Sequence, residues 1–513
     1  MAKRKRTDGR RATATVNDTQ TEQPQAPAAS QLLTMEQAIE LLKTSRPTFY
    51  RWVRHGKVKG TKVGRQWRFY REDIERFLKG QEPRIELRAD LSPLIANLRR
   101  RVEELGARDV APPDATDLVR AISLMIRLGV AMQASDIHIE PQRKAGSNET
   151  IALLRYRVDG VLHPVAEIDA RLLPAIDERW RTMAGCDVHE KVRSQDGRIE
   201  VRLADTGKLV DLRVCFLPAL LGPSLTVRVL DPDAVGPLTL DRIGYAPRDK
   251  EKLIRWLHAP WGGIVITGPT GCGKTTILYA CLNHLATPDR KLMSVEDPVE
   301  FLLPGVLQVP VRPQEGMTFA TALRAFLRSA ANVIMVGEVR DFETLQIVHQ
   351  AALTGHLLLT TLHADEAARA LTRMVEIGSD PFLVADSTKL IVAQRLVRRL
   401  CRECSVEGQP LASHLEQAAE LARAGGLGWD ALPKAFRQPR GCAKCHQTGF
   451  RGRDVIAEAL EVTPEIGAAL RRGASVEELR RIAVGQGMTT MAADGIRRAA
   501  EGLTTLEEVL RVL

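Results

Sequence analysis

The sequence predicts an α/β protein built around a parallel sheet, with a small winged helix-turn-helix before it and a cysteine-containing helical region after it. The first observation is a series of short apolar segments that alternate with helix-compatible stretches between residues 236 and 400. A second is a glycine-rich loop that joins the first apolar segment to a helical stretch. A smaller α/β region, residues 113–235, precedes the sheet. The candidate strands are Ile264–Thr267, Leu292–Val295, Val333–Val336 and Leu357–Thr361.

The glycine-rich loop reads GPTGCGKTT and has the spacing of a phosphate-binding loop between a strand and a helix. Its backbone N–H groups can surround a phosphate at a helix N-terminus, where the helix dipole also favours negative charge. Lys274 is expected to reach the β- and γ-phosphates, Thr275 to hold Mg²⁺, and Cys272 to be a small loop residue. The predicted ATP site comprises Gly268, Pro269, Thr270, Gly271, Cys272, Gly273, Lys274, Thr275 and Thr276.

Length and charge divide the chain unevenly. Its 513 residues correspond to about three or four domains. No apolar run reaches the ~18 residues of a membrane span, and no secretory signal is expected. The net charge of +10 arises in the first 80 residues, where residues 1–30 hold six Lys and Arg against three Asp and Glu, and residues 31–80 hold twelve against five. This excess predicts an acidic partner for the N-terminal region alone.

The N-terminal region divides into three predicted parts. Residues 1–30 have few large apolar side chains and are expected to be a disordered basic tail. Residues 31–80 predict a winged helix-turn-helix, because Thr34 can form a capping box, Ser45 can cap a second helix, and the following residues alternate like a hairpin. Residues 81–112 carry leucines near helical spacing and predict a linker helix.

The stretch from Leu33 to Leu78 resembles the excisionase/MerR-like helix-turn-helix family along its whole length. The resemblance implies that the second helix and the wing face duplex DNA. A basic face of this kind can also dock on an acidic protein or lipid surface, so both interpretations stay open. The residues that the resemblance places toward DNA are Arg46, Thr48, Tyr50, Arg51, Arg54, Lys62, Arg65 and Arg68.

Acidic and imidazole side chains follow three of the candidate strands. Glu338 ends one apolar strand and can hold the Mg²⁺ shell opposite Thr275. Glu296, in the segment SVEDPVE, ends another strand, and a carboxylate there can position or activate the attacking water. His356 and His363 flank a third strand and are candidate sensors of the γ-phosphate, although a lone histidine is more often structural.

Two Cys-x-x-Cys pairs, separated by 37 residues, predict a structural zinc site. Two such knuckles can bring four thiolates to one tetrahedral Zn²⁺. A redox-active pair is the alternative. The four ligands are Cys401, Cys404, Cys442 and Cys445.

A set of motifs in fixed order resembles the type II secretion/type IV pilus assembly ATPase family over about residues 113–513. It comprises ASDIHIEP, RYRVDG, QDGRI, VDLRV, GPTGCGKTT, VEDPVE, GEVRD, the two histidine segments and the paired cysteines followed by TGF and GR. The resemblance implies a RecA-like P-loop ATPase domain over residues 236–400. A tetracysteine zinc element over 401–446 and a helical region over 447–513 follow it.

The same resemblance implies roles for individual residues. Glu296 matches the general base of the family's acidic box, Glu338 its atypical Walker B acid, and His363 its γ-phosphate-sensing histidine. Arg213 in VDLRV, Arg228 in LTVRVL and Arg453 in GFRGRD match arginines that reach the nucleotide and stabilise the transferred phosphoryl group.

The resemblance favours a cytoplasmic, Mg²⁺-dependent ATPase that works as a homohexamer, peripherally associated with the inner membrane through a platform protein. Its implied work is assembly of a type IV pilus or a type II secretion pseudopilus. The alternative is a DNA-binding regulatory or DNA-handling ATPase, which the basic helix-turn-helix favours. A third possibility is that the basic domain only docks on an acidic partner.

Overall fold

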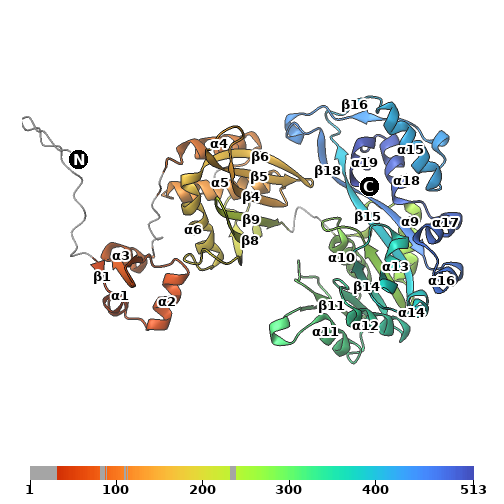
Figure 1. The fold of residues 1–513 in the computed structure, drawn as a ribbon, viewed down its shortest axis with the longest axis horizontal. Helices are drawn as coiled ribbons and strands as arrows, with labels where there is room; N and C mark the ends of the chain where they lie inside the picture. The colour runs from red at the N-terminus through yellow and green to blue at the C-terminus, as the bar shows by residue number, and fades with distance from the viewer. Residues whose placement is uncertain (1–31, 81–86, 88, 109–110, 113, 232–237) are drawn as a thin grey trace, which may run out of the picture.

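The computed structural model describes residues 32–80, 87, 89–108, 111–112, 114–231 and 238–513. The predicted disordered tail, residues 1–30, lies outside this range. Figure 1 shows three parts in chain order: a small N-terminal helical part, an α/β part in the middle, and a larger α/β part that includes the C-terminus. Among the described helices, none has the length and apolar character needed to cross a membrane.

The N-terminal part is a helix-turn-helix followed by a two-stranded wing. Thr34 and Gln37 form the predicted capping box, and the Ser45 side chain caps the second helix. Phe49 and Phe69 meet edge-on, with ring centroids 5.0 Å apart, and join the second helix to the wing. The elements are β1 (Leu32–Leu33), α1 (Met35–Leu41), α2 (Arg46–Arg54), β2 (Thr61–Val63), β3 (Gln66–Tyr70) and α3 (Arg71–Leu78), and the strand order is β1-β3-β2.

The middle part is a six-stranded antiparallel sheet, in the order β6-β5-β4-β9-β8-β7, packed against helices. Trp180 is fully buried in its core, and the Tyr156 hydroxyl donates a hydrogen bond to the Met125 carbonyl at 2.7 Å. The elements are α4 (Ser92–Glu104), α5 (Asp117–Ala131), β4 (Asp136–Arg143), β5 (Thr150–Val158), β6 (Val161–Asp169), α6 (Leu173–Ala184), β7 (Gln195–Arg202), β8 (Leu209–Ala219) and β9 (Gly222–Leu230).

The predicted linker helix is present as α4, but it does more than connect. Its apolar face packs against α5, and Leu94, Leu98 and Val102 are buried in the core of the middle part. Because this face is covered there, α4 is an element of the α/β part.

The larger part contains a seven-stranded sheet in the order β12-β11-β13-β14-β10-β15-β18. Every residue of β10, β11, β13 and β14 is buried, as expected for parallel strands covered on both faces. The elements up to β15 are α8 (Leu240–Ile243), α9 (Pro247–Leu257), β10 (Gly262–Thr267), α10 (Lys274–Leu285), β11 (Leu292–Glu296), β12 (Val306–Pro310), α11 (Phe319–Phe326), β13 (Val333–Val336), α12 (Phe342–Leu353), β14 (Leu357–Leu362), α13 (Ala367–Glu376), α14 (Pro381–Ser387) and β15 (Thr388–Leu400).

The C-terminal region contributes a strand that sequence reasoning missed. β18 (Phe450–Glu461) pairs antiparallel with β15 and completes the large sheet, although the region had been expected to be helical. Its sequence is rich in Arg, Ala and Glu, which are weak strand formers, so long-range pairing decides its conformation. The remaining elements are β16 (Val406–Glu407), α15 (Ala412–Ala424), β17 (Arg437–Gln438), α16 (Pro464–Arg471), α17 (Val476–Gly485), α18 (Met491–Ala500) and α19 (Leu506–Val512).

The packing of α4 gives a stability prediction. Leu98→Ala should lower the free energy of unfolding by about 2–5 kcal/mol, because Leu98 has no exposed surface and its removal leaves a cavity against α5. Leu209→Ala, at a side chain that is 47% exposed in the same part, is the matched control and should change stability by less than about 1 kcal/mol. Chemical denaturation of both variants makes the comparison. Equal losses would show that α4 is not an element of this core.

Candidate functional site

The glycine-rich loop connects β10 to α10 at the carboxyl edge of the large sheet. Gly268, Gly271 and Gly273 have φ values of 141°, 79° and 90°, which other L-residues rarely adopt. A Cβ added at Gly268 would lie 2.5 Å from the Gln394 carbonyl oxygen of the neighbouring strand. The loop can therefore pass this close to β15 only with glycine.

Lys274 begins α10 and folds back over its own loop. Its Nζ donates hydrogen bonds to the carbonyl oxygens of Gly268, at 2.8 Å, and Pro269, at 3.0 Å. Burial lowers the pKa of Lys274, while the nearby Cys272 and Glu338 act in the opposite direction. Thr275, the next residue, is exposed in the first turn of the helix. The ammonium group is thus held at the loop, next to the exposed hydroxyl.

Gln394 of β15 supports the glycine-rich loop through a side-chain hydrogen bond. Its side-chain amide donates to the Cys272 carbonyl at 2.7 Å and accepts a hydrogen bond from the buried Tyr245 hydroxyl. Cys272 itself is 3% exposed, and burial raises the pKa of its thiol. A buried thiol that resists ionisation is a poor nucleophile, because the thiolate is the reactive form. Cys272 therefore fits the interpretation as a small loop residue.

The strand register brings Glu338 and His363 to the edge that carries the loop. Thr267 of β10 lies opposite Leu362 of β14, while Val336 of β13 lies opposite Thr360. His363 Nε2 is 3.5 Å from a carboxylate oxygen of Glu338. The end of β10, which leads into the glycine-rich loop, is linked to the loop after β14, because the Thr267 hydroxyl accepts a hydrogen bond from the Ala364 N–H at 2.9 Å.

Two residues at this site differ from the sequence-based expectation. Arg340 forms an ion pair with Glu338 and a longer one with Asp297, at 3.8 Å, although it was given no role when its motif, GEVRD, was identified. Its position two residues after Glu338 was the only available signal. His356 instead lies at the amino end of β14 and contacts the Ala351 carbonyl at 3.1 Å, so only His363 stands at the glycine-rich loop.

Glu296 ends β11 inside a buried hydrogen-bond network. It is 3% exposed, and its two carboxylate oxygens accept from Tyr279, from Ser294 at 2.6 Å and from Gln308 at 3.1 Å. Hydrogen bonding to Glu296 adds to burial in raising the pKa of Tyr279. Every polar atom of the carboxylate is occupied by a protein donor.

The acidic residues that follow Glu296 are more exposed. The side chain of Asp297 is 42% exposed and that of Glu300 is 24% exposed. The Glu300 N–H donates to the Tyr279 hydroxyl at 3.2 Å, so the buried network also holds the backbone that carries Glu300. Two carboxylates of the SVEDPVE segment therefore keep exposed surface, while Glu296 is enclosed in the network that holds the segment.

The three candidate arginines lie in different places. Arg213 of β8 reaches the acidic segment, with Nη1 2.9 Å from Glu300 and Nη2 donating to the Val299 carbonyl at 3.1 Å. Arg228 lies 3.6 Å from Asp136 on the same sheet, and Arg453 lies 3.9 Å from Asp159. Of these three arginines, Arg213 is the one that links the middle part to the acidic segment SVEDPVE.

The four cysteines lie together beyond the end of β15. Their sulfur atoms all fall within 4.8 Å of one another, and three measured separations are 3.7, 3.8 and 3.9 Å. A tetrahedral Zn²⁺ with bonds of about 2.3 Å requires S–S edges of about 3.8 Å. The N–H groups of Cys442 and Gly449 each donate to the Cys445 sulfur at 3.2 Å. Burial by itself would raise the pKa of the Cys445 thiol, but the hydrogen bonds outweigh this effect and lower the pKa to about 7. The donor set fits zinc.

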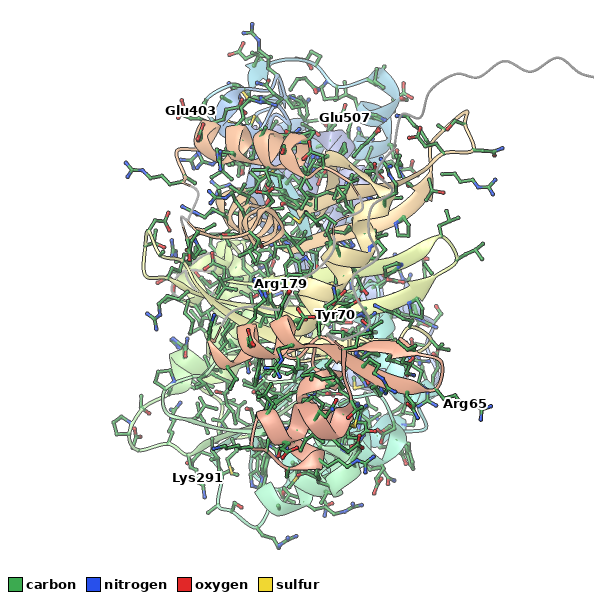
Figure 2. The ribbon with its side chains drawn as sticks, turned by 90° about the vertical axis from the view of Figure 1, so that its left-hand side faces the viewer. Arg65, Tyr70, Arg179, Lys291, Glu403 and Glu507 are labelled. Atoms are coloured by element: carbon green, nitrogen blue, oxygen red, sulfur yellow. The ribbon has the colours of Figure 1, made fainter. Side chains whose placement is uncertain are left out.

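The residues proposed to face DNA gather on α2 and the wing. Arg46, Arg51 and Lys62 are exposed, and Tyr50 is 39% exposed. Figure 2 shows Arg65 at the tip of the wing, pointing away from the molecule. Thr48 interacts with the cap residue Ser45, and Arg68 bonds within the wing, to Gln66 and to the Trp67 carbonyl. Arg54 differs from the others, because it forms an ion pair with the middle part.

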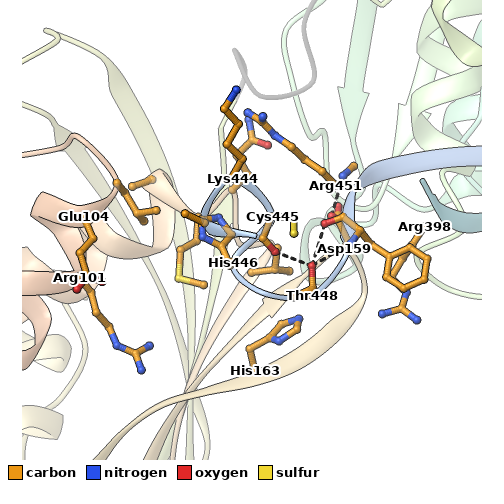
Figure 3. Close-up of a pocket in the computed structure, with 18 of the residues that line it drawn as sticks. Arg101, Glu104, Asp159, His163, Arg398, Lys444, Cys445, His446, Thr448 and Arg451 are labelled. Carbon is orange, nitrogen blue, oxygen red and sulfur yellow. Dashed lines mark hydrogen bonds between the residues drawn. The ribbon is translucent and has the colours of Figure 1, made fainter. Parts of the chain in front are cut away.

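A cavity of about 620 Å³ lies between the middle part and the tetracysteine element. Figure 3 shows His163 and Arg101 on its one side and His446, Lys444 and Arg451 on the other. Burial lowers the pKa of both histidines. The cavity is lined by residues of both the middle part and the tetracysteine element, so its width depends on the relative position of these two parts.

Comparisons with known proteins agree with these motifs. Residues 113–511 match the family model described as Type II/IV secretion system protein, and residues 32–82 match a helix-turn-helix domain. The type II secretion system protein HxcR of Pseudomonas aeruginosa is 41% identical over 427 residues, which cover 83% of each chain. The type IV pilus assembly ATPase PilB of Thermus thermophilus is 38% identical over 424 residues, covering 82% of this chain and 46% of that protein.

Solved structures show the same fold at lower identity. The ATPase DotB of Legionella pneumophila superposes with a TM-score of 0.56 at 21% identity, covering 78% of this chain and 97% of that one. The pilus retraction motor PilT, solved with bound ADP, superposes with a TM-score of 0.50 at 22% identity, covering 76% and 96%. With the family model spanning most of the sequence and relatives near 40% identity, this chain belongs to the Type II/IV secretion system protein family, whose members include the type II secretion and type IV pilus assembly ATPases.

Proposed function

We propose that this chain is a Mg²⁺-dependent ATPase motor that drives assembly of a type IV pilus or a type II secretion pseudopilus. The observation that carries this proposal is the convergence of Lys274, Glu338 and His363 at one edge of the parallel sheet. A phosphate-binding lysine and a metal-binding carboxylate are groups that P-loop ATPases use in phosphoryl transfer, and an imidazole beside them can sense the γ-phosphate.

The chain's own groups divide the work at this site. Lys274 exchanges its two loop carbonyls for phosphate oxygens, and the loop N–H groups surround the phosphates. Thr275 and Glu338 are the residues that would hold Mg²⁺, which supplies charge neutralisation on the phosphates when bound. His363 stands 3.5 Å from Glu338, where it would contact the γ-phosphate of bound ATP. Arg340 pairs with Glu338 and orients its carboxylate.

Two carboxylates compete for the role of general base. Resemblance assigns it to Glu296, but that side chain is buried and occupied by three protein donors. Glu300 is partly exposed and paired with Arg213. A base needs an open path to the attacking water, so geometry favours Glu300 in this role and Glu296 as its support.

The arginines support a mechanism that involves several subunits. The side chains of Arg228 and Arg453 are 58% and 42% exposed and lie away from this chain's own glycine-rich loop. In a homohexamer they are free to reach the nucleotide of a neighbouring subunit, where they would stabilise developing charge on the phosphoryl group. Rotation of the middle part would then couple hydrolysis to mechanical work.

The motor is expected to lie on the cytoplasmic side of an inner membrane and to act through a platform protein there.

A second candidate function is a DNA-handling ATPase, which the helix-turn-helix at residues 32–82 favours. Hydrolysis that proceeds without DNA in a hexamer supports the motor. Hydrolysis that requires duplex DNA supports the second candidate.

The first catalytic prediction concerns the phosphate site. Lys274→Ala should abolish ATP binding, because it removes the cation at the loop. Glu338→Gln should keep ATP binding and lower hydrolysis by about 10²-fold or more, since a neutral amide holds Mg²⁺ poorly. Fluorescent-nucleotide binding and phosphate release measure the two effects separately. Wild-type hydrolysis by Glu338→Gln would rule out this assignment.

The second catalytic prediction separates the two glutamates of the acidic segment. Glu300→Gln should lower kcat by about 10²-fold or more with little change in stability, because its side chain is partly exposed. Glu296→Gln should lower both kcat and the melting temperature, because the amide replaces one acceptor oxygen by a fourth donor in a buried network of three donors. Steady-state kinetics and thermal unfolding of both variants decide the roles. Full activity in Glu300→Gln would contradict this assignment and favour Glu296 as the general base.

The third prediction concerns zinc. Purified protein should contain about one Zn²⁺ per chain, and the Cys442→Ser/Cys445→Ser double variant should lose the metal and melt at a lower temperature. Elemental analysis and thermal unfolding measure both effects. Cys215→Ser, outside the cluster, is the control and should keep the metal. Zinc-free protein with four freely reactive thiols would exclude the site.

A further inference from the structure

The helix-turn-helix contacts the middle part through the carboxyl end of α2. Arg54 Nε lies 2.9 Å from Asp187, and the N–H of Val188 donates to the Arg54 carbonyl at 3.0 Å. Residues 182–189, which we call the docking segment, include the end of α6 and the turn that follows it. One residue of α2 therefore meets this segment through both its side chain and its backbone.

The wing meets the same segment from the other side. The rings of Trp67 and His189 are 4.8 Å apart and meet edge-on. Lys62 of the wing lies over the same Trp67 ring, with its Nζ 5.3 Å from the ring centre. Of the eight residues expected to face DNA, Arg54 pairs with the docking segment, and Lys62 contacts the wing residue that meets it.

The approach also depends on a glycine. Gly56, just after α2, has a φ of +67°, and a Cβ there would lie 2.7 Å from the Thr182 hydroxyl and 2.9 Å from a methyl group of Val188. Both the backbone conformation and the space exclude other residues. An ion pair, a backbone hydrogen bond, a ring contact and a steric requirement therefore all define one interface.

The docking leaves the rest of the basic face open. Arg46, Arg51 and Arg65 are exposed, and the structure gives them no contact with the docking segment. An elongated acidic partner that follows α2 and the wing would meet these residues first and then reach Arg54. At that point it would encounter Asp187, whose carboxylate already holds the guanidinium.

We propose that the docking segment is an intramolecular partner of the helix-turn-helix, and that Asp187 competes with the phosphates of duplex DNA for Arg54. A carboxylate and a phosphate make the same charge-assisted pair with a guanidinium, so only one of them can hold it at a time. Docking ties the helix-turn-helix to the middle part, and DNA binding releases it. The middle part also supplies Arg213 to the acidic segment of the proposed ATP site. Release of the helix-turn-helix therefore frees the middle part, which is the moving part of the proposed motor, from an attached domain.

Hydrogen exchange on the full chain tests the docking. The amide of Val188 should be protected in the wild type, because it donates to Arg54. Asp187→Arg should speed its exchange several-fold, and the charge swap Arg54→Glu/Asp187→Arg should restore protection. Arg51→Glu is the matched control, since it reverses a charge on the same helix outside the interface. Equal exchange at Val188 in the wild type and in Asp187→Arg, or no rescue by the swap, would overturn the docking.

Anisotropy with a labelled duplex of about 25 base pairs, at about 50 mM salt, tests the competition. Asp187→Asn should bind the duplex about threefold more tightly than the wild type, as expected for release of one partly exposed ion pair. Arg51→Ala should weaken binding in both backgrounds. Equal affinity of wild type and Asp187→Asn, or no binding by either, would overturn the competition. Neither measurement depends on ATP hydrolysis, so failure here is distinguishable from failure of the proposed motor.

Discussion

The parallel register of four buried strands is the constraint on which the rest of the proposed ATP site depends. Parallel strands end at the same edge of a sheet, and β10 and β13 both flank β14 there. The glycine-rich loop, Glu338 and His363 therefore meet although they lie far apart in the sequence. The Thr267 hydroxyl fixes the spacing of two of these loops through a hydrogen bond to Ala364. A shift of one residue in this register would separate the cation from the carboxylate.

Burial decides what each charged group at the site can do. Glu296 and Glu300 lie four residues apart in one acidic motif, yet one carboxylate is enclosed by three donors and the other is partly open. The enclosed group cannot exchange a proton with water without losing its hydrogen bonds, and each loss leaves a buried polar atom unpaired. It serves better as an anchor, because Tyr279 and Gln308 bind both this carboxylate and the segment that carries Glu300.

Much of the fold followed from local signals in the sequence. The apolar strands of the large sheet, the capping box at Thr34 and each Cys-x-x-Cys pair are local patterns within a few residues, and the structure has them as expected. The two cysteine pairs come together although 37 residues separate them. The misses depend on distant partners. β18 forms because β15 offers an edge, and α4 loses its role as a connector because α5 covers its apolar face. Arg340 was missed because arginines near an acid are common, and only the structure shows the contact.

The arginines show why residue type alone does not assign a role. Arg54 and Arg213 both pair with carboxylates of another part of the chain, at the same distance of 2.9 Å. Both contacts involve the middle part, one on its docking segment and one within β8. A rotation that opens the Arg213 contact at the ATP site carries the docking segment with it, since α6 and β8 share one packed core. The docked helix-turn-helix is therefore positioned to follow each motion of the middle part, and duplex DNA that takes Arg54 from Asp187 would detach it from that motion.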